Sequence, residues 1–241
     1  MKRILVFLLC LAVVEVVSNK VWANELGPVL VNAHPDAVFA PAGFDDNDDV
    51  QIVVEGMLSD TCHKSGPIYT RIDADKKTIY VTPMAYYYPG SWCAQVEVPF
   101  VRTVALGIFP RGSYSIVVEQ GDGKFAKMAD LPIAVSKNSG PDDYLYAPVT
   151  DVEVRTQGTT PKLVLRGKFT NTCMHLTEVK MVNAPKNVLA VMPIAEMGTE
   201  NCKAEIRAWE TTVEIKTPLQ GKTLVHVRSL DGQSVNRVVE F

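Results

Sequence analysis

Hydrophobic and polar residues alternate one by one along most of this chain, which is the period of a β-strand with one buried face. The alternation is clearest in "QIVVEGML" (51–58) and "KLVLRGKF" (162–169), and again in "GSYSIVVE" (112–119) and "KTLVHVRS" (222–229). An Asp-Gly turn follows each member of the second pair. No long segment has a helical period, so the pattern predicts an all-β fold.

The first half of the chain contains several such segments, and their spacing indicates the type of β fold. They lie at about 37–42, 50–58, 67–72, 77–82, 94–108, 113–119 and 125–134. Around seven strands in roughly 100 residues is the size of an immunoglobulin-like sandwich. No tryptophan lies midway between the cysteines, as it would in an antibody domain. We therefore predict immunoglobulin-like sandwich architecture without membership of the antibody family.

The second half of the chain repeats the first. "VVEGMLSDTC" (53–62) matches "VLRGKFTNTC" (164–173), and after the second cysteine of each half the register continues without a gap. Pairs that match in type and order include Gly56 and Gly167, Thr61 and Thr172, Cys62 and Cys173, Cys93 and Cys202, and Phe100 and Trp209. Such a repeat indicates two tandem copies of one structural unit.

The repeat sets the expected domain plan. Domain 1 is predicted at 37–135 and domain 2 at 144–241, with an N-terminal extension at 24–36 before them. The linker at 136–143, "SKNSGPDD", is rich in Ser, Asn, Gly, Pro and Asp without hydrophobic periodicity. So short a linker is expected to permit only limited swing between the domains.

Each copy has its own pair of cysteines. Four cysteines allow three pairings, and the repeat favours Cys62 with Cys93 and Cys173 with Cys202. Closing a loop of about 30 residues stabilises a domain by roughly 3 to 4 kcal/mol in the chain-entropy model. One disulfide inside each domain is therefore expected.

The motif G-x-[LF]-[ST]-[DN]-T-C, then a second cysteine, "VEVPFVRTVAL" and the closing strand "GSYSIVVE", resembles cysteine-paired β-sandwich repeats of exported bacterial proteins of unassigned function. The resemblance covers both halves and is best in residues 50–120. It implies a fold and a compartment, and it supplies neither an activity nor site residues.

The first 23 residues have the features of a secretory signal peptide. Lys2 and Arg3 precede the apolar run "ILVFLLCLAVV" (4–14), and "VWA" (21–23) fits a cleavage site. The apolar run is shorter than the roughly 20 residues that a spanning helix needs. We expect an exported protein, periplasmic or extracellular, without a transmembrane anchor.

Composition and motifs argue against several classes of function. The formal net charge is −3, and no clustered basic face suggests a nucleic-acid partner. No G-x-S-x-G elbow, P-loop or H-E-x-x-H helix occurs. The histidines, His34, His63, His175 and His226, show no local metal-ligand spacing. We expect no catalytic residue, no metal site and no cofactor.

The run "FDDNDD" (44–49) is the strongest charge feature. Its four aspartates, Asp45, Asp46, Asp48 and Asp49, offer hard oxygen ligands of the kind that calcium prefers. The run lacks the form of an EF-hand loop, and in the repeat it aligns with the turn "RTQGTTP" of the second copy. An exposed acidic turn is the alternative to a calcium site.

The stretch "PMAYYYPGSWC" (83–93) is the candidate binding surface. Its aromatic residues are Tyr86, Tyr87, Tyr88 and Trp92, and the second copy has "PIAEMGTENC" (193–202) in their place. A fold requirement would apply to both copies, so the aromatic residues favour an interface. Three consecutive strand residues cannot share one face, so at least one tyrosine is expected to point outward. The alternative is that these rings pack against domain 2 or the N-terminal extension.

Three functions are carried forward. The first is a non-enzymatic exported protein that binds a protein or polysaccharide of the cell envelope through this loop. The second is a structural spacer or assembly subunit of an envelope complex. The third is a metal-dependent or hydrolytic enzyme with a site between the domains, for which His63 and His175 would be the residues to change.

Overall fold

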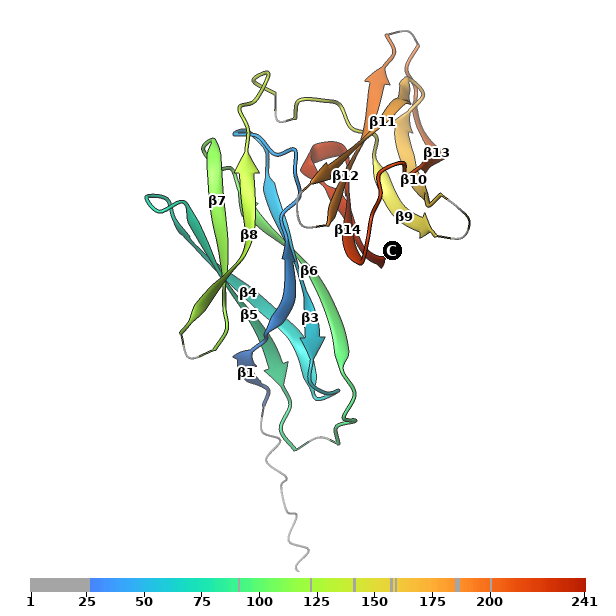
Figure 1. The fold of residues 1–241 in the computed structure, drawn as a ribbon. Coiled ribbons are helices and arrows are strands. Elements are labelled where there is room, and N and C mark those ends of the chain that lie inside the picture. Colours follow the sequence, from blue (N-terminus) through green and yellow to red (C-terminus); the bar gives the residue numbers. More distant parts are fainter. Residues whose placement is uncertain are drawn as a thin grey trace, which may run out of the picture.

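The computed structural model describes residues 27–241 except 91, 122, 141, 157, 159, 185, 186 and 200. The predicted signal peptide (1–23) lies outside this range. The chain folds into two β-sandwiches that lie side by side, joined by a linker that crosses between their upper ends in Figure 1.

Domain 1 consists of two sheets. The first has the order β2-β3-β6 and contains β2(Pro35–Phe39), β3(Val50–Leu58) and β6(Val98–Gly107). The second is centred on β5(Thr78–Tyr87), with β4 along one side and both β7 and β1 on the other. Its remaining strands are β1(Val29–Asn32), β4(His63–Asp73), β7(Gly112–Glu119) and β8(Phe125–Ile133).

Domain 2 repeats this plan, but the counterpart of β1 is reduced to a single β-bridge, between Tyr146 and Ile194 of β12. A three-stranded sheet has the order β13-β10-β9, from β9(Val149–Arg155), β10(Lys162–Asn171) and β13(Ala204–Glu214). A four-stranded sheet has the order β11-β12-β14-β15, from β11(Met174–Ala184), β12(Val188–Met197), β14(Lys222–Arg228) and β15(Ser234–Glu240). A single turn of 3-10 helix, η1(Leu230–Gly232), joins β14 to β15.

The predicted all-β fold of two tandem sandwiches is confirmed, and so are both disulfides, Cys62–Cys93 and Cys173–Cys202. The strands of domain 1 follow the predicted segments closely. Two details add to the prediction. The segment 24–36 supplies β1 and the start of β2, so its described part belongs to domain 1. In each domain one pair is parallel, β5 with β7 and β12 with β14, whereas antibody sheets are antiparallel.

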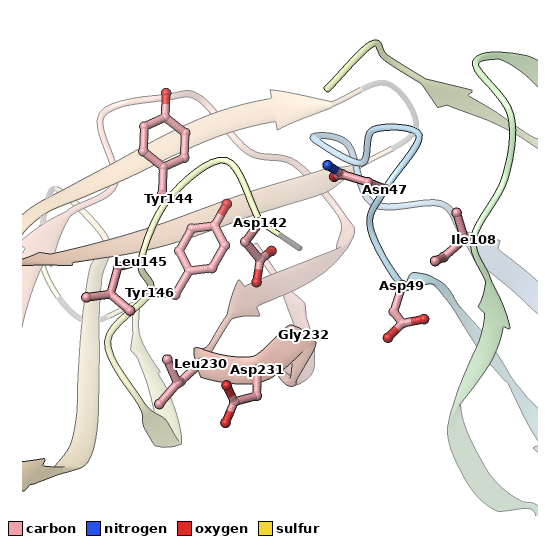
Figure 2. Close-up of a pocket in the computed structure, with 10 residues that line it drawn as sticks. All are labelled: Asn47, Asp49, Ile108, Asp142, Tyr144, Leu145, Tyr146, Leu230, Asp231 and Gly232. Atoms are coloured by element: carbon pink, nitrogen blue, oxygen red, sulfur yellow. The ribbon is translucent and has the colours of Figure 1, made fainter. Parts of the chain in front are cut away.

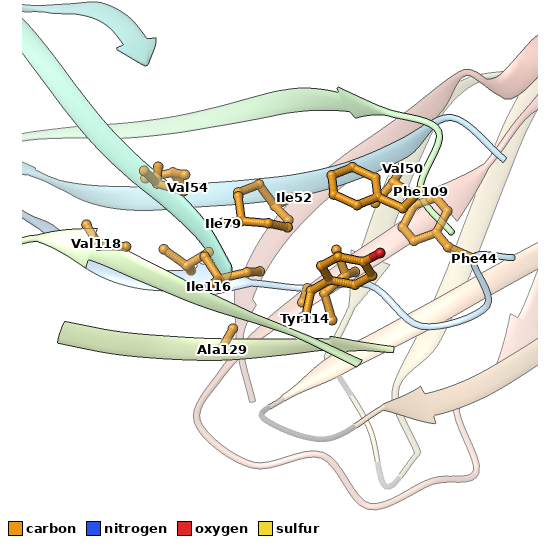
Figure 3. Packing of buried hydrophobic residues seen from close by; sticks show 14 of the residues in the cluster. Phe44, Val50, Ile52, Val54, Ile79, Phe109, Tyr114, Ile116, Val118 and Ala129 are labelled. Atoms are coloured by element: carbon orange, nitrogen blue, oxygen red, sulfur yellow. The ribbon is translucent and has the colours of Figure 1, made fainter. Parts of the chain in front are cut away.

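The core of domain 1 lies between its two sheets (Figure 3). The inward residues of β3 and β7, among them Ile52 and Ile116, are fully buried there. At one end Phe109 and Tyr114 meet edge to face, with ring centroids 5.0 Å apart. The Tyr114 hydroxyl donates to the carbonyl of Pro110 at 3.0 Å, a bond that fixes the corner before β7 as in the tyrosine corner of sandwich domains.

The glycine shared by both copies has a packing role. Gly56 lies opposite Phe100 on the neighbouring strand, and Gly167 lies opposite Trp209. A Cβ on Gly56 would lie 2.9 Å from the Phe100 ring, and one on Gly167 would lie 2.6 Å from the Trp209 ring and collide with the carbonyl oxygen of Pro148. Each glycine therefore provides the space in which an aromatic ring crosses the strand.

The shared [DN]-T-C motif fixes the chain around each disulfide. Asp60 and Asn171 each accept a hydrogen bond from the backbone N–H of the cysteine two residues later, both at 2.9 Å. The hydroxyls of Thr61 and Thr172 accept backbone N–H bonds from the residue after the second cysteine, at 2.9 and 3.0 Å. The repeated motif therefore encodes one disulfide-linked corner, built twice.

A separate cluster of buried hydrophobic residues lies between the two domains. The outer face of β2 and β3 packs against β12 and β14, and the buried residues of this contact are Phe39, Val53, Val188 and Leu224. Beside them Lys222 donates to the buried carboxylate of Glu55 at 2.8 Å. The contact makes the two sandwiches one packed unit, in line with the limited swing expected of the linker.

The faces that would extend this stacking to further domains are polar. In domain 2 the cross-strand partners Val188 and Leu224 are apolar and face domain 1. The pair at the same place in domain 1, Thr78 and Ser115, is polar. In domain 1 the cross-strand partner of Val53 is Phe39. The residue of domain 2 that corresponds to Val53 is Val164, and its cross-strand partner is Glu153. Neither pair therefore offers the apolar contact that joins these two domains.

Candidate functional site

The aromatic stretch lies at the end of domain 1 that is remote from domain 2. Tyr86 and Tyr87 end β5, and the following loop crosses from one sheet to the other before β6 begins. Figure 1 shows this loop at the lower end of domain 1, with domain 2 beside the upper end. We call the end formed by Tyr86, Tyr87, Tyr88 and Trp92 the aromatic tip.

The three tyrosines have different environments. Tyr86 points out of the sheet and is 38% exposed. Tyr87 points the other way and stacks on His63, its cross-strand partner, with ring centroids 4.9 Å apart. The ammonium of Lys64 lies 4.9 Å from the centre of the Tyr88 ring. The outward tyrosine expected from strand geometry is therefore Tyr86, and Tyr87 supports the β4–β5 corner.

Trp92 is the most exposed large hydrophobic residue of the described chain, at 102% of its reference area. It immediately precedes Cys93, so the disulfide to Cys62 anchors its backbone. The loop is held on its other side by the bond from the Tyr88 N–H to the Cys62 carbonyl at 3.0 Å. A large apolar ring is thus held in solvent on a loop that is fixed at both ends.

Domain 2 builds the same loop without the rings. The Gly198 N–H bonds to the Cys173 carbonyl at 3.0 Å, which matches the Tyr88–Cys62 bond of domain 1. Glu196 and Met197 occupy the positions of Tyr86 and Tyr87. Because the backbone anchor is conserved between the copies and the aromatic side chains are not, the fold does not require those side chains.

The structure does not show the rings packed against domain 2. The apolar contact between the domains is formed by β2, β3, β12 and β14, at the other end of domain 1. The N-terminal segment does reach the tip. β1 pairs with the end of β5, where Leu30 lies opposite Tyr86 and Val29 opposite Tyr87. Val29 and Leu30 are themselves exposed, so they add to the apolar surface around the tyrosines and do not cover those rings.

The acidic run is a structural part of the domain boundary. Asp45 and Asp48 are buried, at 4% and 1% exposure, so the expected exposed turn is wrong for these two residues. The Asp45 carboxylate accepts the Asn47 N–H at 3.2 Å, and the Asp46 carboxylate accepts the Ser136 N–H at 2.9 Å. The carboxylates considered for calcium are therefore largely engaged in fixing the run and the linker.

Arg228 is the main partner of this run. Its guanidinium contacts both carboxylate oxygens of Asp48, at 2.7 and 3.0 Å, and Asp142 of the linker at 2.9 Å. The rings of Phe44 and Tyr146 lie 5.2 and 5.0 Å from it. Sequence reasoning missed this residue, although an arginine at the end of the apolar strand "LVHVR" was a signal that it needed a buried acidic partner.

The charges around Arg228 do not balance, because one guanidinium faces the buried carboxylate of Asp48 and the half-buried carboxylate of Asp142. Burial raises the pKa of Asp142 to about 6, the positive charge of Arg228 opposes this rise, and the negative charge of Asp48 adds to it. His226, on the same strand, is fully buried, and this burial lowers its pKa to about 4.

The histidines do not gather into one site. His63 bonds to Asp60 at 2.7 Å, His175 lies near the Cys173 carbonyl, and the Nδ1 of His226 lies 2.7 Å from the side-chain oxygen of Asn236. Among the described residues, the one group of three potential metal ligands is Asp60 with Cys62 and Cys93. Those two cysteines form a disulfide, so they offer no thiolate.

Comparisons with known proteins bear on the fold. The family model described as the ORF11 beta-sandwich domain matches residues 52–127, from within β3 to the start of β8. The match is to part of domain 1 and supports a β-sandwich there. Neither curated proteins nor solved structures gave a match to this chain.

The described part of the chain contains no helix long and apolar enough to cross a membrane.

Proposed function

We propose that this is a non-enzymatic exported protein that binds a partner of the cell envelope through the aromatic tip of domain 1. The observation that supports it most is Trp92, a fully exposed ring held on a loop that a disulfide anchors. Exposed tryptophan and tyrosine are typical of binding hot spots, because they bury a large area with little loss of side-chain entropy. The two disulfides fit an oxidising compartment.

The composition of the tip favours a protein partner over a glycan. Val29, Leu30 and Val96 are exposed near this end together with Tyr86 and Trp92. Aliphatic side chains add apolar area that a protein surface would bury, whereas sugar stacking needs the flat rings alone. The polysaccharide interpretation is retained as a distinct outcome of the experiment.

The experiment compares wild type with Tyr86→Ser/Trp92→Ser in co-sedimentation with envelope extract and with purified cell-wall polysaccharide. Tyr87 is left intact because it packs on His63. The matched control is Met197→Ser/Ile206→Ser, which removes two exposed apolar side chains from domain 2. We expect the tip variant to lose binding by at least about thirtyfold, as for a hot-spot residue worth roughly 2 kcal/mol, and the control to bind as wild type does.

The source of the captured material identifies the partner. Loss of the wild-type signal after protease treatment of the extract shows a protein, and retention on purified polysaccharide shows a glycan. Equal binding by wild type and the tip variant, or no binding by wild type, contradicts the proposal.

The second candidate is a rigid spacer in an envelope complex, and the shared core of the two domains favours it. Such a protein would hold two attachment points at a fixed separation. Small-angle scattering would test this idea, because a spacer needs a single extended shape in solution and a broad distribution of shapes would contradict it.

A further inference from the structure

A cavity of about 570 Å³ opens at the boundary between the domains, remote from the aromatic tip (Figure 2). Asn47, Asp49 and Ile108 approach it from domain 1, and Leu145, Tyr146 and Leu230 from domain 2. Domain boundaries are a common location for small-molecule sites, whose volumes are about 300 to 1,000 Å³. The size and place of this cavity therefore suit a small ligand.

The charged groups of the wall are all acidic. Asp49, Asp142 and Asp231 line the cavity, and among the described residues no lysine, arginine or histidine does. Arg228 lies beside Asp142 but is already shared with Asp48. Within the described part of the chain no ion pair engages Asp49 or Asp231. Both carboxylates are exposed, so they present negative charge to solvent and to a ligand in the cavity.

Two polar groups of the wall have no hydrogen-bond partner among the described residues, and one of them, the Asn47 oxygen, is fully enclosed. Tyr146 is 2% exposed, and its hydroxyl makes no hydrogen bond to the described residues. The side-chain oxygen of Asn47 is buried and likewise has no hydrogen-bond partner there. Buried polar atoms are nearly always paired with protein, water or a ligand. The Tyr146 hydroxyl lines the cavity and can accept a hydrogen bond from a ligand, as the carboxylates can, whereas the enclosed Asn47 oxygen is out of reach of a ligand.

The spacing of the carboxylates favours an organic cation over a bare metal ion. Among the described residues, Asp49, Asp142 and Asp231 do not form a group of three ligand atoms within 4.8 Å of one another. A metal ion needs several oxygens at short range. The apolar side chains of Ile108, Leu145 and Leu230 would in turn contact a carbon skeleton.

We propose that this cavity binds a small organic cation, a protonated amine attached to a compact apolar body. The ammonium group donates to the carboxylates of Asp49 and Asp231, and the apolar body packs against Ile108, Leu145 and the ring of Tyr146. The site does not depend on the aromatic tip, because the two lie in different parts of the molecule.

The test is a titration of the mature protein with benzylamine, followed by amide chemical shifts in NMR spectra at neutral pH. Benzyl alcohol and benzoate are the neutral and anionic isosteres. We expect saturable shifts with benzylamine, at least about tenfold weaker binding of benzyl alcohol because charge-assisted hydrogen bonds are stronger, and no binding of benzoate. Asp49→Asn/Asp231→Asn should weaken benzylamine binding by at least about tenfold.

The matched control is Asp75→Asn, an exposed aspartate in the β4–β5 turn, which should bind benzylamine as wild type does. Equal binding of benzylamine and benzyl alcohol overturns the proposal, and so does unchanged affinity in Asp49→Asn/Asp231→Asn. An absence of saturable shifts in wild type does the same. Equal weakening in Asp75→Asn would show attraction to overall charge and would also overturn it.

Discussion

Arg228 and Asp48 form a buried ion pair across the domain boundary, with both carboxylate oxygens within 3.0 Å of the guanidinium and exposures of 7% and 1% for the two side chains. Removing one partner of such a pair leaves an uncompensated buried charge, which costs about 3 to 5 kcal/mol. We therefore expect Arg228→Met to lower the free energy of unfolding by this amount in urea denaturation.

Two further variants make this test specific. Arg155→Met removes an exposed arginine that pairs with Glu153, and a change below about 1 kcal/mol is expected for such a surface pair. Asp48→Asn/Arg228→Met should recover part of the stability, because the fully buried Asp48 is then replaced by a neutral side chain and only the partly exposed Asp142 lacks its arginine partner. An Arg228→Met protein as stable as wild type would show that the pair does not hold the domains.

The raised pKa of Asp142 gives a second prediction, for stability against pH. The folded-state pKa of about 6 lies above the ordinary value of 3.8, so the folded chain binds this proton more tightly than the unfolded chain. The contribution of Asp142 is therefore fully present below pH 4 and is lost as the pH rises to 6. His226 acts oppositely, because its pKa falls from 6.5 to about 4 and its contribution is lost as the pH falls through that window.

The two effects are separated by measuring the free energy of unfolding of wild type and Asp142→Asn between pH 4 and pH 7. Arg228, Asp48 and Asp45 act on the pKa of Asp142 and are present in both proteins. The stability of the variant relative to wild type should rise with pH across this window. A difference that does not change with pH would contradict the raised pKa.

The shared glycine gives a third prediction, for packing. Gly167→Ala should destabilise the protein more than Gly56→Ala, because its Cβ would collide with the Pro148 carbonyl oxygen and lie 2.6 Å from the Trp209 ring, whereas the nearest atoms to a Cβ on Gly56 are 2.9 Å away. Overpacking of this kind costs about 1 to 3 kcal/mol. Gly27→Ala is the control, since nothing lies within 4 Å of a Cβ there. Thermal unfolding that places Gly167→Ala level with Gly27→Ala would contradict the packing role.

The alternation of hydrophobic and polar residues and the repeat were sufficient to predict the strands, both domains and both disulfides, because each depends on local pattern or on the comparison of two copies. The contact between the domains was not predicted. Its residues were visible as the adjacent apolar pair Val53 and Val54, which indicates a strand buried on both faces. The face of domain 2 that covers Val53 depends on tertiary geometry that no local pattern contains.

Part of the candidate site could also be predicted by comparing the two copies in the sequence. The missing aromatic residues of the second copy located the tip, but its exposed residues could not be separated from its packed ones without coordinates. Tyr87 was assigned to the binding surface by sequence, and the structure places it against His63. The boundary cavity was not predicted, because its wall combines residues such as Asp49 and Asp231 that are distant in sequence.

The core between the domains gives a fourth prediction. Phe39→Glu copies the residue that domain 2 has at the corresponding position, Glu153, and it would bury a charge between the domains. We expect the variant to unfold in two steps, since the domains then lose their mutual stabilisation, whereas wild type unfolds in one. Calorimetry distinguishes the two cases. A single transition in the variant would show that the domain contact does not couple unfolding.

The two disulfides give the last prediction. They close loops of similar length, but only one of them holds the loop that carries Trp92. Their sequence separations are 31 and 29 residues, so replacing either pair by serine should cost roughly 3 to 4 kcal/mol. Only the Cys62→Ser/Cys93→Ser variant releases the loop that holds Trp92, and it should therefore lose binding to envelope extract and gain a protease cut near residue 92. The Cys173→Ser/Cys202→Ser variant loses comparable stability and should retain both properties. If both variants bound equally well under conditions in which both are folded, rigid presentation of the tip would not be needed, and the proposed role of the disulfide in recognition would be wrong.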